Sequence, residues 1–303
     1  MSCGGAIARS DICAAVVTFF PPSECAENLL ALAPQVGRLL VVDNGSSPET
    51  WQPLEPVVRK VGATAVRLGS NFGIARALNV GLQHAHEQGF RWLATFDQDS
   101  RAVPGMLEQM GAALSAYPEP DRVGLIAPVH VDRRAGVVIS DRYREASAPL
   151  WHVIRTTMTS GNLVNVAAAL EVGGFDDSLF IDYVDNEFCL RLRHRRYRVL
   201  EATQAQLSHS LGALEVRDLG IVRAGITNHS ALRRYYMTRN RLLIWRQYWR
   251  WEPAWVLRDM RRFLSESAGI VLFEKDVAAK ARMTLRGIRD AFHNIRGAFD
   301  ASR

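Results

Sequence analysis

The chain has 303 residues, of which 48% are hydrophobic, and this is enough for one extensive core, in one large domain or in a domain with an appendage. No window approaches ~20 consecutive apolar residues, which excludes a membrane-spanning helix, and we expect no signal peptide because the first residues lack a basic flank and a continuous apolar run. The formal net charge is +6, and many of the arginines lie in the last third, which indicates an anionic surface or partner there.

The cysteines indicate a reducing compartment. There are four, Cys3, Cys13, Cys25 and Cys189, scattered without CxxC spacing, and two of them lie in segments expected to be buried. We therefore expect free thiols and a cytoplasmic protein, with peripheral contact at the inner face of the membrane as a further expectation.

The first two thirds alternate between expected strands and helices. Residues 12–18 (ICAAVVT) form an apolar, β-branched run that is typical of a strand buried on both faces, and Ser23 after two prolines is a plausible N-cap for a helix reaching residue 32. The expected elements that follow are a strand at 38–42, a helix at 49–60, a strand at 65–68, a helix at 74–86, a strand at 91–96 and a helix at 103–116. Such alternation predicts an α/β fold with a mostly parallel, doubly wound sheet.

Three of the expected strands end in polar residues, Thr18, Asp43 and Asp97, and ligands of open parallel sheets bind beyond the carboxyl ends of the strands. Asp97 and Asp99 (FDQDS, residues 96–100) point the same way in an extended segment and repel each other unless a cation or solvent lies between them. Mg²⁺ takes such oxygen ligands and shares them with substrate phosphates. A plain turn at a strand end is the alternative.

Several motifs in chain order resemble those of family 2 glycosyltransferases of the GT-A fold, and more narrowly the bacterial rhamnosyltransferases that use dTDP-L-rhamnose. The matching stretches are VVTFFP at 16–21, VDNGS at 42–46, NFGIARALNVG at 71–81, FDQDS at 96–100, GGFD at 173–176 and FIDYVDNEFCLR at 180–191. The resemblance covers roughly residues 12–245. Phe20 stands where the first motif usually has Asn, so any role of that side chain is absent.

The resemblance implies a donor site at the strand ends. Thr18 and Phe19 would contact the base with backbone and ring, and Asp43 would accept from N3–H of thymine or uracil; a local Asx-turn is the alternative for Asp43. Arg76 could reach the nucleotide or be a surface arginine. Asn71 and Asn79 are expected to fix loops through backbone hydrogen bonds.

The resemblance also implies a divalent cation, Mg²⁺ or Mn²⁺, bound by Asp99, with Asp97 nearer the ribose. His209 follows a predicted final strand at the interval where related enzymes supply a further metal or diphosphate ligand. His229 is its rival, and a structural role is the alternative for either histidine.

Asp185 matches the position of the catalytic Asp of the family and would be the general base. Asp182 and Glu187 are the other candidates. Glu187 would orient neighbours or an acceptor hydroxyl, and Asp182 or Asp185 could instead cap a helix that starts near 185 and runs beyond Leu192. One base without a nucleophile implies direct displacement with inversion at the anomeric carbon.

We expect a catalytic domain at residues 1–215 and a helical region at 216–303 that faces the acceptor or a membrane. From Arg233 onward, tryptophans mix with many arginines. This pattern fits a helical cap with its arginines in water, or a cap that also contacts anionic membrane; we expect no nucleic-acid partner.

The function that these expectations support is an inverting, metal-dependent rhamnosyltransferase. It would move L-rhamnose from dTDP-L-rhamnose to a saccharide or lipid-linked saccharide during synthesis of surface polysaccharide or glycolipid. The alternatives are the same fold with a UDP-hexose or UDP-galactofuranose donor, a non-catalytic nucleotide-sugar-binding module, and a nucleotidyltransferase. The last would normally show a glycine- and basic-rich phosphate loop after the first strand, which PPSEC (residues 21–25) does not offer.

Overall fold

The computed structural model describes residues 7–132, 149–209, 215–218, 223–226 and 228–302. By its internal contacts the chain divides into two compact units, one of residues 1–177 and 184–210 and one of residues 178–183 and 211–303. The short segment 178–183 therefore belongs to the second unit, although the chain on both sides of it belongs to the first.

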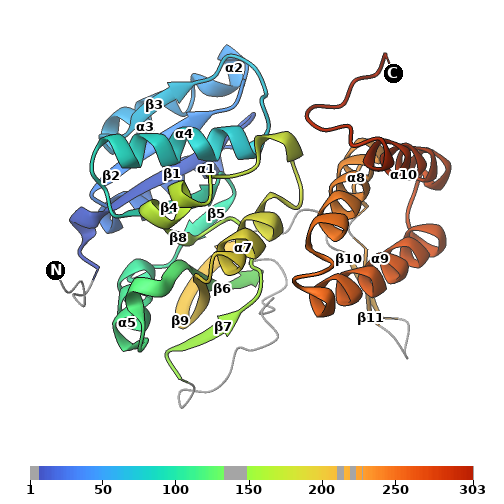
Figure 1. Cartoon of the computed structure of the whole chain (residues 1–303). Coiled ribbons are helices and arrows are strands. Elements are labelled where there is room, and N and C mark those ends of the chain that lie inside the picture. The colour runs from blue at the N-terminus through green and yellow to red at the C-terminus, as the bar shows by residue number, and fades with distance from the viewer. Residues whose placement is uncertain (1–6, 133–148, 210–214, 219–222, 227, 303) are drawn as a thin grey trace. The chain divides into compact units, whose positions relative to one another are not determined.

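The first unit is a sheet flanked by helices (Figure 1). Its strands are β1 Ile12–Thr18, β2 Arg38–Asp43, β3 Thr64–Arg67, β4 Trp92–Asp97, β5 Ser100–Ala102, β6 Val123–Asp132, β7 Trp151–Ile154, β8 Asn162–Asn165 and β9 Arg198–His209. Its helices are α1 Glu24–Leu32, α2 Pro48–Trp51, α3 Glu55–Lys60, α4 Ile74–Glu87, α5 Met106–Ala116, α6 Val166–Glu171 and α7 Val184–His194.

The strand order is β3-β2-β1-β4-β8-β6-β9-β5, and β7 also pairs with β9. The neighbours β3, β2, β1 and β4 are all parallel, with Val16 opposite both Val41 and Phe96. In the other half, β8 is antiparallel to β4 and β6, β9 is parallel to β6, and β5 and β7 are antiparallel to β9. The predicted α/β class is confirmed; the parallel arrangement holds for the half built from β1 to β4, and the whole sheet is mixed.

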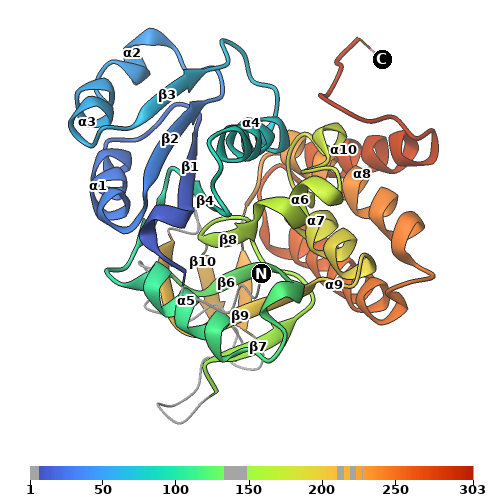
Figure 2. The same ribbon diagram turned by 60° about the vertical axis from the view of Figure 1, so that its left-hand side comes forward.

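Alternate residues of β1 face different helices, and all seven are buried. Ile12, Ala14 and Val16 join the apolar cluster that includes side chains of α1, α3 and α5. Ala15 faces α4, where a Cβ on Gly81 would lie 2.6 Å from the Ala15 Cβ, so glycine lets α4 approach closely. Figure 2 shows α1 and α4 on opposite sides of β1 and β2.

Proline shifts two of the predicted helices. The helix expected at 49–60 is two short helices, α2 and α3, separated around Pro53, because proline has no N–H to donate and its ring clashes with the preceding turn. The helix expected at 103–116 begins at Met106, after Pro104 and a left-handed Gly105.

The second unit comprises a two-stranded hairpin of β10 Glu215–Asp218 and β11 Arg223–Ile226, and the helices α8 Ala231–Tyr248, α9 Pro253–Phe273 and α10 Val277–Phe292. Helices α8 and α10 approach closely, since a Cβ on Gly287 would lie 2.8 Å from the carbonyl oxygen of Tyr235, and the Tyr235 hydroxyl donates to Asp290 at 2.9 Å. Among the described residues, no helix combines the length and the apolarity needed to cross a bilayer.

Helix α8 also holds the segment 178–183 in an unusual conformation. Phe180, Asp182 and Tyr183 have φ of 66°, 62° and 66°, a region that side chains other than Gly, Asn and Asp rarely occupy. The Asn240 amide, fully buried on α8, donates to the carbonyl oxygens of Leu179, Ile181 and Asp182 at 2.9, 2.8 and 2.9 Å. The hydrogen bonds of one side chain thus fix the chain immediately before α7.

Candidate active site

The polar residues at the strand ends meet at one edge of the sheet. Thr18 lies opposite Asp43 in the register of β1 and β2, and Val17 lies opposite Asp97 in the register of β1 and β4. Because β2 and β3 lie to one side of β1 and β4 to the other, this edge is the point where the strand order reverses, which is where open α/β sheets bind ligands.

Asp43 is fully buried and surrounded by hydrogen-bond donors. Thr18 Oγ1 and the Ser46 hydroxyl donate to Oδ1, while the Ser46 N–H and Arg67 Nε donate to Oδ2; the Thr18, Ser46 N–H and Arg67 distances are 3.3, 3.3 and 3.2 Å. The local bond to Ser46 is the kind that the turn alternative predicts. Four donors fill the acceptor capacity of a carboxylate, so a base that donates to Asp43 must displace one of them.

The Gln98 side chain forms two hydrogen bonds with the main chain of Phe19. Its Oε1 accepts from the Phe19 N–H at 2.8 Å, and its Nε2 donates to the Phe19 carbonyl oxygen at 3.1 Å. The carbonyl oxygen of Gln98 in turn accepts from Asn28 Nδ2 of α1 at 2.9 Å. Phe19 is 41% exposed, so these two hydrogen bonds hold its main chain without burying its side chain.

No role was predicted for Gln98. The only signal in the sequence is its place between the two acids of FDQDS; the register of β1 with β4, seen in the structure, brings it beside the end of β1. Residue type alone did not distinguish it from any polar turn residue.

The loop that carries Asp97 and Asp99 is fastened through Ser160. The Asp97 N–H donates to Ser160 Oγ at 2.9 Å, and that hydroxyl donates to Ser100 Oγ at 2.7 Å. Both acids are half-buried. Burial, with a further contribution from the Asp99 charge, raises the pKa of the Cys25 thiol to about 12, which places Asp99 near α1.

Two carboxylates at a strand end suit a hard divalent cation that takes its remaining oxygens from substrate phosphates. Among the described residues, no three His, Cys, Asp or Glu side chains gather into a metal site of their own. The carboxylate oxygens of Asp97 and Asp99 are ligands of the kind that a cation shared with a diphosphate takes.

The two histidines predicted as possible ligands, His209 and His229, lie in different parts of the chain. His209 is the last residue of β9, and its main chain pairs opposite Ser100, directly after Asp99; its side chain lies outside the described part. His229 belongs to the second unit, where burial and the charges of Arg233 and Arg234 lower its pKa to about 4.

Asn79 and Arg76 on α4 both contact the turn that follows α6. Asn79 exchanges hydrogen bonds with the main chain of Phe175 and donates to Asp177 at 2.6 Å, so its predicted loop-fixing role is confirmed. The expectation for Asn71 is also confirmed, since its Oδ1 accepts from the Gly73 N–H at 2.9 Å. Arg76 is exposed and forms an ion pair with Asp177 at 3.5 Å.

Asp185 is the second residue of α7, and its Oδ1 accepts from the N–H and the side-chain amide of Asn186 at 2.7 and 2.9 Å. Glu187 is buried and forms an ion pair with Arg191 at 2.7 Å, and Arg191 also donates to the carbonyl oxygen of Gly174. Glu187 therefore orients its neighbours, as one of its two predicted roles states. Asp182, in the second unit, pairs with Arg233 at 3.0 Å.

The segment 157–160 contacts both α7 and the strand that carries the acids. Thr95 Oγ1 on β4 donates to the carbonyl oxygen of Thr159 at 2.6 Å, and Cys189, one turn after Asp185, is hydrogen-bonded to the main chain of Thr157. Burial raises the pKa of Cys189 to about 12. Cys13, Cys25 and Cys189 are buried free thiols, as predicted, and Cys3 lies outside the described residues.

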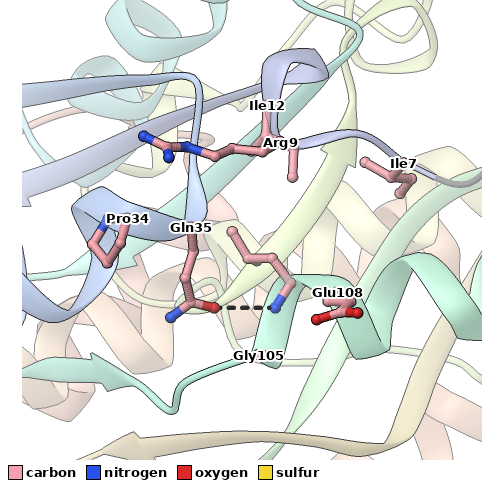
Figure 3. Close-up of a pocket in the computed structure, with 8 residues that line it drawn as sticks. Ile7, Arg9, Ile12, Pro34, Gln35, Gly105 and Glu108 are labelled. Atoms are coloured by element: carbon pink, nitrogen blue, oxygen red, sulfur yellow. Dashed lines mark hydrogen bonds between the residues drawn. The ribbon is translucent and has the colours of Figure 1, made fainter.

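A cavity of about 320 Å³ lies elsewhere, at the amino end of β1 (Figure 3). Its lining includes Arg9, Ile12, Gln35 and Glu108. Ile12 begins β1 and Thr18 ends it, so this cavity is separate from the strand ends where the acids lie.

Comparison with known proteins gives the family. The profile described as Glycosyl transferase family 2 matches residues 23–157. The chain is 30% identical over 252 residues to the dTDP-rhamnosyl transferase RfbF of Shigella flexneri. The match covers 79% of this chain and 81% of that protein.

Solved structures give the fold. S. aureus TarS 1–349 in complex with UDP-GlcNAc superposes with a TM-score of 0.64 at 15% identity, over 94% of this chain and 81% of that one. GalNAc-T7 with UDP, GalNAc and Mn²⁺ gives 0.60 at 11% identity, and the match spans 94% of this chain but only 56% of that longer one. The predicted GT-A fold is confirmed, and the chain is an enzyme that belongs to glycosyltransferase family 2.

Proposed function

We propose that the protein transfers L-rhamnose from dTDP-L-rhamnose to a saccharide or lipid-linked saccharide, with inversion at the anomeric carbon. The observation that carries this proposal is the 30% identity, over 252 residues, to a protein named as a dTDP-rhamnosyl transferase. The acidic loop and the exposed Phe19 ring at one sheet edge support it, because they offer the contacts that a sugar nucleotide needs.

In this proposal the thymine base stacks on the Phe19 ring, and Thr18 and Asp43 meet its polar edge. Asp43 becomes an acceptor for N3–H when the Ser46 or Thr18 hydroxyl turns away from it. Arg76 leaves its exposed pair with Asp177 at little cost, since such pairs contribute about 0–1 kcal/mol, and it can then face the nucleotide.

Asp97 and Asp99 would hold a divalent cation, Mg²⁺ or Mn²⁺, with His209 as a further candidate ligand. Such a cation neutralises the charge that grows on the leaving diphosphate. The Mn²⁺ bound to GalNAc-T7, a structure of similar fold, supports a divalent metal without deciding its identity.

Asp185 is the proposed general base. It accepts the proton of the acceptor hydroxyl while that oxygen bonds to the anomeric carbon and the bond from carbon to the diphosphate oxygen breaks. Asn186 and the α7 main chain orient the carboxylate. The electron pair of the broken bond leaves with the nucleoside diphosphate.

The test is release of nucleoside diphosphate from dTDP-rhamnose, UDP-glucose and UDP-galactose, with and without Mg²⁺ or Mn²⁺. We expect Asp185→Asn to lose turnover by ~100-fold or more while it binds donor within about threefold of the wild type. Asp121→Asn, an exposed aspartate outside the site, is the matched control. Normal turnover of Asp185→Asn contradicts the base, and turnover without metal contradicts the role of Asp99.

A uridine donor is the second candidate. The matched TarS and GalNAc-T7 structures contain UDP-GlcNAc and UDP, respectively. Preference for a UDP-sugar in the same assay would replace rhamnose in the proposal and leave the fold and the acid–base roles in place. Peripheral contact with an anionic membrane is also part of the proposal.

A further inference from the structure

Helix α9 exposes an apolar stripe that nothing in the described second unit covers. Leu257, Met260, Leu264 and Val271 are 49%, 40%, 68% and 66% exposed. Their spacings of three, four and seven residues place them on one side of a helix, and we call them the α9 face. The buried residues of α9 are Trp255, Val256 and Asp259, so the helix packs mainly through its first turns.

Positive charge lies on one flank of the α9 face. Arg261 is next to the face around the helix and Arg258 follows it, and both are exposed. The two acids of α9 lie on the side of the helix that packs: Asp259 accepts from the Tyr183 hydroxyl and Trp245 Nε1, and Glu266 pairs with Arg241 and with Arg262.

Two large aromatic side chains lie just before the N-terminal end of α9. Trp249 and Trp251 are exposed in the turn between α8 and α9, and Arg250 lies between them. Indole rings favour the boundary between water and lipid, because the ring is apolar and its N–H is polar. Figure 1 shows α9 as a long helix beside α8 and α10 in the second unit.

We infer that the α9 face lies in the interface of an anionic bilayer. An apolar stripe with arginine along one flank is a pattern of helices that bury one side at the level of the headgroups, and acidic lipid attracts the arginines. The inference deepens the proposed function, on which it rests for its role: a helix docked in this way would hold the enzyme where a lipid-linked acceptor is found.

The two other occupants of such a face fit it less well. In a symmetric dimer the same patch meets itself, which would bring Arg258 and Arg261 of one copy towards those of the other. Nucleic acid would satisfy the arginines, but it would leave the central leucines against phosphates and water.

Flotation with vesicles tests the inference on the full chain. We expect the wild type to float with vesicles that contain phosphatidylglycerol at least ~10-fold better than with phosphatidylcholine alone, and to lose binding in high salt. Leu264→Asp with Val271→Asp should reduce flotation by ~10-fold or more, because two carboxylates would enter the apolar layer. Arg258→Gln with Arg261→Gln should reduce it by several-fold and flatten the dependence on salt.

Leu30→Asp, an exposed leucine of α1 in the first unit, is the matched control and should float like the wild type. The inference is overturned if the wild type does not float with anionic vesicles, or if the Leu264→Asp, Val271→Asp variant floats as well as the wild type. A lipid-free dimer that this variant dissociates, seen by sedimentation velocity, would assign the face to a second copy. Flotation needs neither donor nor acceptor, so it can fail while the proposed transfer reaction stands, and the reverse also holds.

Discussion

Gln98 offers the sharpest test of how the donor site is held together. We predict that Gln98→Met weakens binding of the nucleoside diphosphate without disturbing the fold. Methionine matches the length of glutamine but lacks both amide groups, so it removes the bonds to the Phe19 N–H and carbonyl oxygen at 2.8 and 3.1 Å. The Phe19 main chain would then be ordered only when the nucleotide binds, and binding would become weaker by that ordering free energy.

The two hydrogen bonds set the size of the effect. Each contributes about 0.5–1.5 kcal/mol net, so the pair contributes roughly 1–3 kcal/mol. If the whole amount is needed for an ordered Phe19, Kd rises by about 5- to 150-fold. We expect the lower part of this range, about 5- to 30-fold, because the site lies at the surface and water replaces part of each lost bond.

Isothermal titration of dTDP and UDP into wild type and variant measures the effect, with and without Mn²⁺. The weakening should persist without metal, because Gln98 acts on Phe19 and not on the cation. Gln83→Met, at an exposed glutamine of α4 whose side chain donates to Glu87, is the control for the substitution itself. The reasoning is refuted if Kd for Gln98→Met stays within about twofold of the wild type, or if Gln83→Met weakens binding equally.

Three further predictions concern stability. Asp43→Asn should lower the free energy of unfolding by about 1–3 kcal/mol, because the amide cannot accept from all four donors and leaves Arg67 Nε poorly paired; urea unfolding checks this. The pKa of His229 is lowered from 6.5 to about 4, so the unfolded chain binds more protons than the folded chain, and the free energy of unfolding falls as the pH drops from 6.5 towards 4. His229→Gln should make this fall smaller by about 1–2 kcal/mol, whereas the control variant His86→Gln, at an exposed histidine, should leave it unchanged. Asn240→Leu should lower the free energy of unfolding by about 2–4 kcal/mol, since the carbonyl oxygens of Ile181 and Asp182 lose Asn240 as a donor while that of Leu179 keeps Arg239; an unchanged free energy in urea unfolding would contradict this role.

The half of the sheet built from β1 to β4 could be predicted from the sequence, because its strands are marked by local runs of apolar residues. Residues 12–17 are all apolar, and with Thr18 they form β1 with the expected bounds, because a strand buried on both faces needs no alternation. The strands β5 and β8 are only three and four residues long, and β8 begins and ends with asparagine. Strands that short carry no period, and their place is set by antiparallel partners far along the chain.

The candidate site also has a part that the sequence predicts and a part that only the structure shows. The place of Asp43 and Asp97 at the strand ends, with Asp99 just beyond, could be predicted because acids after apolar strands are conspicuous. The groups that hold the site act on main chain across long separations: Gln98 on Phe19, and Ser160 on the Asp97 N–H. Their side chains are ordinary turn residues in the sequence, and only the register of the strands shows what they touch.

Phe20 shows how such main-chain contacts let a motif residue change. The motif that the chain resembles has Asn at this position, and Phe20 has a φ of 49°, a left-handed conformation that Asn tolerates and that costs other residues roughly 1–2 kcal/mol. The Phe20 N–H donates to Ser46 Oγ at 2.8 Å, a bond that either residue can make, so it holds the turn in both cases. The Phe20 ring packs edge-to-face on Phe19 with centroids 4.6 Å apart, and this contact, which contributes about 0.5–1.5 kcal/mol, offsets the cost. The motif position therefore specifies a backbone conformation, and a second exposed aromatic ring can replace the asparagine beside the proposed base site without loss of the turn.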